Sequence, residues 1–465
     1  MPRGAFGSEV GGLQPLENAP YSFGAPPPGE VVNSVHSCAF TKPMWSLAIT
    51  AVLLPIMLLF AGAAFTSTQE RSLGDTIGQT DTSSGGAATK LFAYVTGTMV
   101  IVLVAREFHV LLNKLLKSRL VLSVLLLSAL STIWSQDPLL TLRCVFWLLL
   151  SILFVYWLTV SLSVDQQMQL LMLTGFAAAS MSILVVVLVP RVGLDAAHGN
   201  AWQGVFLSKN HMGRIMLFLL TPAIHYRSRG SNQEWIRGAY VVLILFMIAM
   251  SGSASAWLFT IAYLLFAGVL RQIGRVSKRD RYVSIVSVSA VFAVFGAVTV
   301  AYLQPILGLF GRDATLTGRT TIWKVLLLSI EKRPLLGYGY QAFWAGPRSE
   351  GMHAMIRIFG TMHFLTSYAH GGFISVVLEE GVVGLAVIAL LMATGVRDAV
   401  SCLVNARDRS YTNWYIGILF LTVIYNLDEV TIEMPRYLPW MMCILALTAL
   451  SAESASARRK PEMAT

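Results

Sequence analysis

Long apolar runs constrain the fold of this chain more than any other feature of its sequence. Twelve such stretches, nearly free of charged residues, follow one another along most of the chain. A membrane-crossing helix needs about 20 apolar residues, and a helix satisfies its backbone hydrogen bonds without water. We therefore expect an all-α polytopic membrane protein with about 12 transmembrane helices. The expected spans cover residues 44–64, 91–105, 119–134, 144–162, 168–189, 212–226, 239–250, 256–270, 282–303, 373–395, 413–427 and 437–451.

The scarcity of charge supports this class. Charged residues make up 12% of the 465 residues and hydrophobic residues 55%, whereas an ordinary soluble domain is about 25% charged. The formal net charge is +10, but the basic residues stand in short clusters between apolar runs. This distribution indicates membrane topology, and we expect no nucleic-acid partner.

The four cysteines give no sign of a metal site or a disulfide framework. Cys38, Cys144, Cys402 and Cys443 share no CxxC or other metal-ligand spacing. We expect no bound metal and no cofactor.

The distribution of Lys and Arg predicts the orientation. With the N-terminus in the cytoplasm, 20 of the 34 Lys and Arg residues fall in cytoplasmic segments. Half of the other 14 belong to a single long loop, and loops beyond about 60 residues largely escape the positive-inside rule. Both termini are therefore expected in the cytoplasm. The expected organisation is a disordered tail without a signal peptide at 1–42, spans 1–9 at 43–303, a folded periplasmic loop between spans 9 and 10 at 304–370, spans 10–12 at 371–452, and a cytoplasmic tail at 453–465.

The periplasmic loop is expected to fold and to carry the chemistry, because it is rich in both aromatic and basic residues. A helix is predicted to begin near Arg319, with Thr317 or Thr320 as N-cap, and to end before Pro334. An Arg beside exposed helix N–H groups suits a phosphate. Alternatively, Arg319 stacks on Trp323 and contributes only packing.

Glycine and aromatic residues alternate further along the loop. Tyr338 and Trp344 are candidates for stacking on a sugar. A belt of aromatic residues at the membrane interface is the alternative explanation.

Five sequence elements occur in an informative order. WSQDP at 134–138 is followed by Arg143, and WQGVF at 202–206 is followed by KNHMG at 209–213. The loop and the next span then contribute GRTTIW, RPLLGYGYQAFW, and YAHGGF followed five residues later by EEGVVG. Together they resemble the O-antigen ligase/polymerase superfamily (Wzy/WaaL-like), in particular its exopolysaccharide-polymerase, ExoQ-like branch. The similarity covers roughly residues 119–435.

This resemblance implies glycan transfer at the periplasmic face of the bacterial inner membrane, by a protein of GT-C-like glycosyltransferase architecture. The implied substrate is an oligosaccharide linked to undecaprenyl pyrophosphate in the membrane lipid, with neither a nucleotide sugar nor a metal. The implied partners are the flippase and the chain-length and export proteins of the same pathway.

The resemblance also assigns residue roles. His370 stands where the family has its loop histidine, which implies that it acts as the base on the acceptor hydroxyl. Arg319 is the first candidate for stabilising the pyrophosphate leaving group, because transfer needs positive charge there. Lys209 and Arg312 are the next candidates for that role, followed by Arg143 and Arg214. Lys209 and Arg214 could instead simply snorkel at a span end. The remaining substrate-binding candidates are His363, Tyr338, Trp344, Glu379, Asn426 and Glu429.

Two departures from the family pattern affect these assignments. The family has His-Asn where this chain has His370 followed by Gly371, which keeps His363 as a second candidate for the base. Asn426 and Glu429 match the Asn-x-x-Glu signature, with Val430 in place of a small hydroxyl residue. They are expected either to hold a basic loop residue or to line the sugar path.

Glu379 and Glu380 lie in the apolar run of the expected tenth span. Carboxylates within a membrane mark functional sites or pair with a polar partner. In a continuous helix Glu379 would lie about 14 Å below His370. That distance would exclude it from the same site.

Three functions fit a membrane protein with these features. The leading one is an exopolysaccharide polymerase that joins lipid-linked repeat units, and the alternative is a ligase that moves a finished glycan to another acceptor. A transporter of polysaccharide or lipid-linked glycan would predict two related halves with broken helices in matching positions. The sequence shows no such repeat.

Overall fold

The computed structural model describes most of the chain beyond the N-terminal tail. The described residues are 47–60, 62, 87–196, 199–228, 230–277, 280–284, 319–346, 348–359, 369–405 and 410–462. Several predicted features lie outside the described residues: the tail at 1–42, nearly all of the ninth span, and the candidates Arg312 and His363. For Arg319 only the backbone is described.

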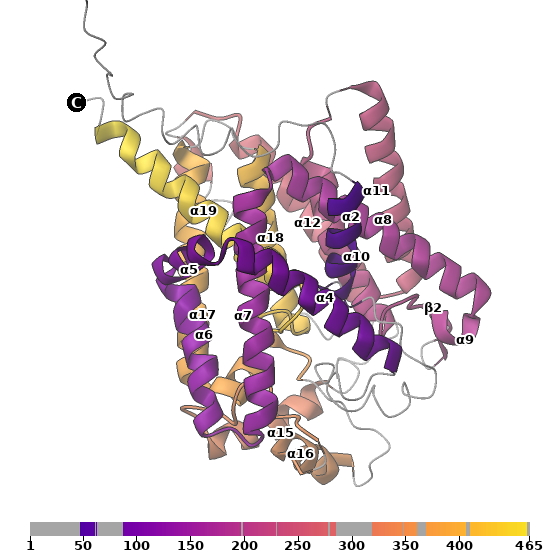
Figure 1. Ribbon diagram of the computed structural model, residues 1–465, viewed down its shortest axis with the longest axis vertical. Helices are drawn as coiled ribbons and strands as arrows, with labels where there is room; N and C mark the ends of the chain where they lie inside the picture. The colour runs from indigo at the N-terminus through magenta and orange to yellow at the C-terminus, as the bar shows by residue number, and fades with distance from the viewer. Residues whose placement is uncertain are drawn as a thin grey trace, which may run out of the picture. The chain divides into compact units, whose positions relative to one another are not determined.

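The described part is almost entirely helical (Figure 1). Its one sheet is a two-stranded antiparallel ribbon in which Leu194 pairs with Trp202 and Asp195 with Ala201. The elements are α2 (Leu47–Phe60), α4 (Ala87–Arg106), α5 (Phe108–Lys117), α6 (Arg119–Leu130), η1 (Ser131–Ile133), α7 (Pro138–Ser161), α8 (Val164–Leu188), α9 (Pro190–Gly193), β1 (Leu194–Asp195), β2 (Ala201–Trp202), α10 (Lys209–His225), α11 (Ser231–Ser251), α12 (Ala254–Ile273), α15 (Arg319–Lys332), α16 (Glu350–Phe359), α17 (Gly372–Asn405), α18 (Ser410–Asp428) and α19 (Leu438–Glu462).

The helices confirm an all-α membrane protein at the level of fold class. Within the described ranges, six helices are long and apolar enough to cross a membrane: α7, α8, α11, α12, α17 and α19. A seventh span is added if the bent pair α4–α5 counts as one. The predicted count of about 12 spans and the periplasmic placement of the loop stay predictions.

Local sequence signals explain where several of these helices begin. Asp137 accepts a hydrogen bond from the backbone N–H of Leu140, and Pro138 occupies the first position of α7. Ser163 and Gln166 form a capping box at the start of α8. Ser208 caps α10 by accepting a hydrogen bond from the N–H of His211.

One end of the helical bundle gathers the termini of several helices. The carbonyl of Tyr340 accepts a hydrogen bond of 2.9 Å from Thr141, in the first turn of α7. α10 begins, α18 ends and α19 begins near the start of α17. Helices α17, α18 and α19 pack on one another, and α10 packs on α18 and α19. The segment 429–437 between α18 and α19 is therefore enclosed by helix ends.

Helix α17 is broken near its start, which corrects the expectation of a continuous tenth span. Gly381 has φ 69° and ψ −166°, outside the helical range. The break exposes the carbonyls of Leu378 and Glu379, and the N–H groups of Tyr338 and Gly339 donate to them at 2.9 and 2.8 Å. The Gly–aromatic segment of the loop thus completes the hydrogen bonds of the broken helix. A Cβ on Gly381 would lie 2.1 Å from the carbonyl oxygen of Leu335, so only glycine fits there.

The start of α17 packs tightly on the end of α18 at Gly372. A Cβ at this position would lie 1.8 Å from Oδ1 of Asn426, which itself holds the following turn. We expect Gly372→Ala to lower the unfolding free energy by about 1–3 kcal/mol. This is measurable as a lower thermal midpoint of the purified protein. The matched control is Gly371→Ala, whose added Cβ would meet nothing nearer than Ile374 Cδ1 at 3.5 Å. Equal midpoints for the two variants would contradict the packing described here.

Candidate active site

Glu429 lies at the centre of the candidate site. It directly follows α18, and its side chain is only 4% exposed. Its Oε2 lies 3.7 Å from Nη1 of Arg214 on α10, and its Oε1 lies 3.7 Å from Nδ1 of His370 at the start of α17. One buried carboxylate therefore brings together a guanidinium and an imidazole from distant parts of the chain.

Arg214 is buried beside this carboxylate. The residue is 6% exposed, and its Nη1 donates a 3.0 Å hydrogen bond to the carbonyl of Val430. The guanidinium carbon lies 5.7 Å from the centre of the Tyr437 ring, within cation–π range. A buried charge persists only when it is paired and hydrogen-bonded, and these three partners meet that requirement. Arg214 is thus held in place rather than snorkelling at the end of its span.

His370 adopts a backbone conformation that is uncommon for a side-chain-bearing residue. Its φ is +48°, in the left-handed region. Non-glycine residues there cost about 1–3 kcal/mol and tend to occur at functional sites. The side chain is 17% exposed, so it reaches both the buried Glu429 and the outside of the bundle.

Asn426 builds the turn that presents Glu429. Its Oδ1 accepts hydrogen bonds from the N–H groups of Thr431 and Ile432 at 2.9 and 3.1 Å, and its Nδ2 donates to Thr431 Oγ1. Its remaining hydrogen bond is donated by Nδ2 to the carbonyl of Thr422 in its own helix. Asn426 therefore holds the turn that carries Glu429, and its predicted roles toward a basic loop residue or a sugar stay predictions.

Helix α15 is connected to the same region through Trp323. The indole Nε1 donates a 2.9 Å hydrogen bond to the carbonyl of Ala369, the residue before His370. Arg319 is the first residue of α15, one helical turn before Trp323. The backbone of Arg319 thus begins a helix that is bonded next to His370, and its proposed role at the pyrophosphate stays a prediction.

The other basic candidates whose side chains the structure describes are Lys209 and Arg143. Lys209 is half-buried in the first turn of α10, five residues before Arg214. Arg143 is exposed on the second turn of α7. The structure joins Arg214 to Glu429 and His370, although the sequence ranked Arg214 below Lys209.

Glu379 holds the loop at the helix break. Its Oε2 accepts hydrogen bonds from the backbone and side-chain nitrogens of Gln341 at 3.0 and 3.2 Å, and its Oε1 accepts one from Ser375. Glu379 is 5% exposed. It therefore acts in this structure as a support for the Gly–aromatic segment, which agrees with the polar-partner alternative.

The two aromatic candidates differ in exposure. Tyr338 is 4% exposed, packs in a cluster with Leu326 and Phe343, and donates its hydroxyl to the carbonyl of Ser329. Its ring is part of the interior of the loop, so sugar stacking by Tyr338 is wrong for this conformation. Trp344 is half-buried against Phe343, with ring centroids 4.9 Å apart.

Sequence reasoning did not select His211, which lies one turn before Arg214. Its ring is centred 5.5 Å from Phe206 and 5.7 Å from Tyr437. Neither ring nitrogen has a hydrogen-bond partner among the described residues, although the residue is only 4% exposed. The signal was present in the KNHMG string, where only the lysine was taken as a candidate.

Backbone strain marks the same region and could not be read from the sequence. Of the five non-glycine residues with positive φ in the described part, four lie around the site: Gln341, His370, Glu433 and Arg436. Glu433 is 2% exposed, and its carbonyl accepts a hydrogen bond from the hydroxyl of Tyr340. Its two carboxylate oxygens have no partner among the described residues.

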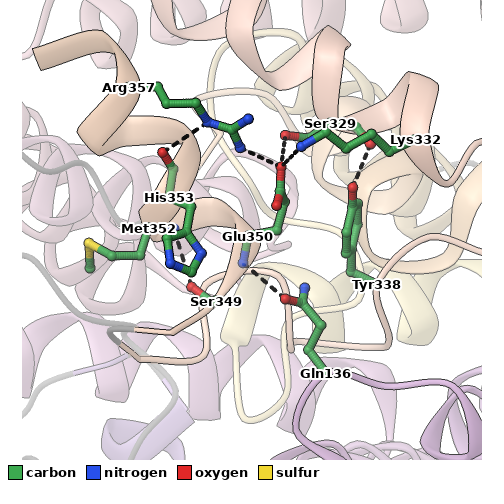
Figure 2. Close-up of polar contacts among 9 residues, drawn as sticks. All are labelled: Gln136, Ser329, Lys332, Tyr338, Ser349, Glu350, Met352, His353 and Arg357. Carbon is green, nitrogen blue, oxygen red and sulfur yellow. Dashed lines mark hydrogen bonds and ion pairs between the residues drawn. The ribbon is translucent and has the colours of Figure 1, made fainter.

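Glu350 connects the two loop helices (Figure 2). Its Oε1 accepts hydrogen bonds from Lys332 at 2.5 Å, from Arg357 at 2.7 Å and from Ser329 at 3.2 Å. Its backbone N–H donates to the side chain of Gln136, in the turn before α7, at 2.9 Å. This carboxylate thus ties α15 and α16 to each other, and its backbone ties them to the membrane-embedded helices.

The pKa of Glu350 predicts an acid-sensitive loop. Partial burial acts to raise this pKa, but the hydrogen bonds and charges of Lys332 and Arg357 outweigh it and hold the pKa below its usual value. The stabilisation is therefore complete above the unfolded-state pKa of about 4.3 and is lost as pH falls through the lower folded-state value.

We accordingly expect Glu350→Gln to destabilise the loop at pH 7 by only about 1 kcal/mol, since both cations are half-exposed. Once the pH lies below the folded-state pKa of Glu350, the substitution should make no difference. Limited proteolysis of the loop as a function of pH measures this. Lys324→Gln, an exposed change on α15, is the control. Equal protection of wild type and Glu350→Gln at pH 7 would contradict the expectation.

The described residues contain no group of three or more His, Cys, Asp or Glu side chains placed to hold a metal ion. What the site offers is a buried guanidinium for an anion, a carboxylate that orients an imidazole, and the imidazole itself. Such an arrangement can stabilise a negatively charged leaving group and accept a proton from a hydroxyl.

The fold and the site define a multi-pass, all-α membrane protein with an Arg–Glu–His group where its helix ends converge. Comparison with known proteins shows which family the chain resembles. The O-Antigen ligase family (Wzy_C) matches residues 239–389, which include Arg319, His370 and Glu379. The chain is also 27% identical over 269 residues to the exopolysaccharide production protein ExoQ of Rhizobium meliloti (strain 1021), covering 55% of this chain and 60% of that protein. The chain thus resembles the O-antigen ligase family over part of its length, and it spans less than two thirds of the ExoQ protein.

Proposed function

We propose that this chain is an exopolysaccharide polymerase that joins oligosaccharide repeat units carried on undecaprenyl pyrophosphate. The observation that carries the proposal is the position of Glu429 between Arg214 and His370. A glycosyl transfer from a lipid pyrophosphate needs a cation for the leaving group and a base for the acceptor, and this carboxylate holds one of each.

In the proposed reaction the acceptor hydroxyl attacks the anomeric carbon of the donor glycan. The new carbon–oxygen bond forms as the bond to the pyrophosphate oxygen breaks, with inversion at that carbon. His370 takes the hydroxyl proton through the nitrogen opposite Nδ1, because Glu429 faces Nδ1. Undecaprenyl pyrophosphate leaves, and Arg214 and the loop residue Arg319 stabilise its charge.

The proposed setting is the periplasmic face of a bacterial inner membrane, with both termini in the cytoplasm. The flippase that delivers the lipid-linked units, and the proteins that set chain length and export the polymer, are the proposed partners. These assignments rest on the distribution of basic residues and on the likeness to the ExoQ protein.

A ligase that moves finished glycan to another acceptor is the second candidate, because the matching family is described by that activity. Deleting the gene and sizing the glycan that remains would separate the two. A strain without a polymerase retains single repeat units on the carrier lipid. A strain without a ligase accumulates long polymer on that lipid, and this result would overturn the polymerase proposal.

A further inference from the structure

Helix α5 departs from the direction of the membrane spans. It follows α4 directly, and the two helices meet at an angle of 85°. α4 is 20 residues long and apolar along most of its length. The 85° bend means that the two helices cannot both run along the bilayer normal, and we take α4 as the crossing helix and α5 as lying along the membrane surface.

Contacts with α7 place α5 at the membrane face opposite the candidate active site. Nζ of Lys114 donates a 2.5 Å hydrogen bond to Thr159, near the C-terminal end of α7. Thr141, near the other end of α7, bonds to the carbonyl of Tyr340 in the loop. Thr141 and Thr159 are 18 residues apart, about 27 Å along the helix axis, so α5 lies toward the end of α7 that is remote from the loop.

The residues of α5 divide into three faces at 100° per residue. Leu111 and Leu115 are buried against the neighbouring helices. The second face is apolar and exposed: Phe108 is 43% and Leu116 53% exposed.

The third face of α5 is polar, and it consists of the exposed residues His109, Asn113 and Lys117. A helix that lies in the membrane interface needs one face toward the protein, one toward the lipid and one that is polar, and α5 has all three.

Positive charge surrounds the polar face. Arg106 ends α4, Lys117 ends α5 and Arg119 begins α6, and all three are exposed. None of them forms an ion pair with the residues that the structure describes. Glu107 is the one acidic residue between Arg106 and Arg119. The surface is thus complementary to anions at the level of the lipid headgroups.

We propose that α5, with Arg106 and Arg119, is an interfacial helix that binds the phosphate headgroups of anionic phospholipids on the face opposite the active site. Phe108 and Leu116 would insert among the acyl chains, and the basic side chains would contact the headgroup phosphates. This inference does not depend on the reaction proposed above.

The test uses the full-length protein reconstituted in phosphatidylcholine vesicles that carry spin-labelled phosphatidylglycerol or spin-labelled phosphatidylcholine. Electron paramagnetic resonance measures the relative association of the two lipids with the protein. We expect the wild type to prefer phosphatidylglycerol, and the triple variant Arg106→Gln/Lys117→Gln/Arg119→Gln to lose about threefold or more of that preference. Raising the salt concentration to 1 M should also abolish the preference of the wild type, because the Debye length falls to about 3 Å.

The matched control removes the same charge from the same membrane face, by Arg237→Gln/Arg271→Gln/Arg275→Gln. Those guanidinium groups already bond within the protein, to Glu234, to the carbonyl of Ile224 and to Gln272. We expect the control to keep most of the preference. The proposal is overturned if the wild type shows no preference, if the preference survives 1 M salt, or if the control loses as much as the α5 variant.

Discussion

Replacing His370 by asparagine should lower the rate of glycan transfer by about 10²–10⁴-fold while leaving the fold intact. The rate falls because asparagine cannot take the proton of an acceptor hydroxyl, and general-base catalysis contributes about that factor. The fold survives because asparagine tolerates the left-handed backbone that His370 adopts, with φ +48°. Alanine would confound the test, since it adds backbone strain at this position.

The measurement is polymer yield in a deletion strain complemented with each variant at equal membrane levels. His370→Gly, which also suits a positive φ, should be equally inactive. His353→Asn changes an exposed histidine on α16 and should keep wild-type yield. His363→Asn tests the second candidate for the base. Near-normal polymer from His370→Asn, together with loss in His363→Asn, would transfer the role to His363.

Replacing Arg214 by methionine should remove both stability and activity. It leaves Glu429 buried at 4% exposure without its guanidinium partner, and an uncompensated buried charge costs about 3–5 kcal/mol. The thermal midpoint of the purified protein should fall accordingly. Arg237→Met, which breaks an ion pair with the half-exposed Glu234, should change stability by no more than about 1 kcal/mol.

The double variant Arg214→Met/Glu429→Leu separates the structural role of this pair from its chemical role. Apolar residues of similar volume often replace a buried ion pair without loss of stability. We expect the double variant to recover most of the midpoint lost by Arg214→Met and to stay inactive, because both the cation and the support for His370 are gone. Recovery of activity along with stability would show that Arg214 serves only the fold.

Much of the helical architecture was predictable because apolar runs of about 20 residues have few alternatives to a membrane helix. Eleven of the twelve predicted stretches coincide with helices in the described part, and the ninth lies almost wholly outside it. The break in α17 was not predicted. The Gly381 that allows it stands in a continuous apolar run, and the loop N–H groups that bond to the broken helix come from a segment 40 residues earlier.

The sequence predicted which residues belong to the site better than it predicted the contacts between them. His370, Arg214, Glu429 and Asn426 were all candidates, and the holding role for Asn426 and Glu429 was one of two alternatives. Glu429 meets Arg214 and His370 only through tertiary packing, and residue spacing along the chain does not predict such contacts. Tyr338 was misassigned because an alternation of glycine and aromatic residues does not say which rings are buried. Glu433 carried no signal at all, since its left-handed backbone is visible only in the fold.

The central claim is that Arg214, Glu429 and His370 transfer glycan from a lipid pyrophosphate. The most direct test incubates the purified protein in liposomes with repeat units on undecaprenyl pyrophosphate, and follows both the length of the glycan and the released undecaprenyl pyrophosphate. The wild type should form a ladder of products and release one undecaprenyl pyrophosphate for each new glycosidic bond, whereas His370→Asn and Arg214→Met/Glu429→Leu should do neither. A ladder formed by both variants at the wild-type rate would contradict the account.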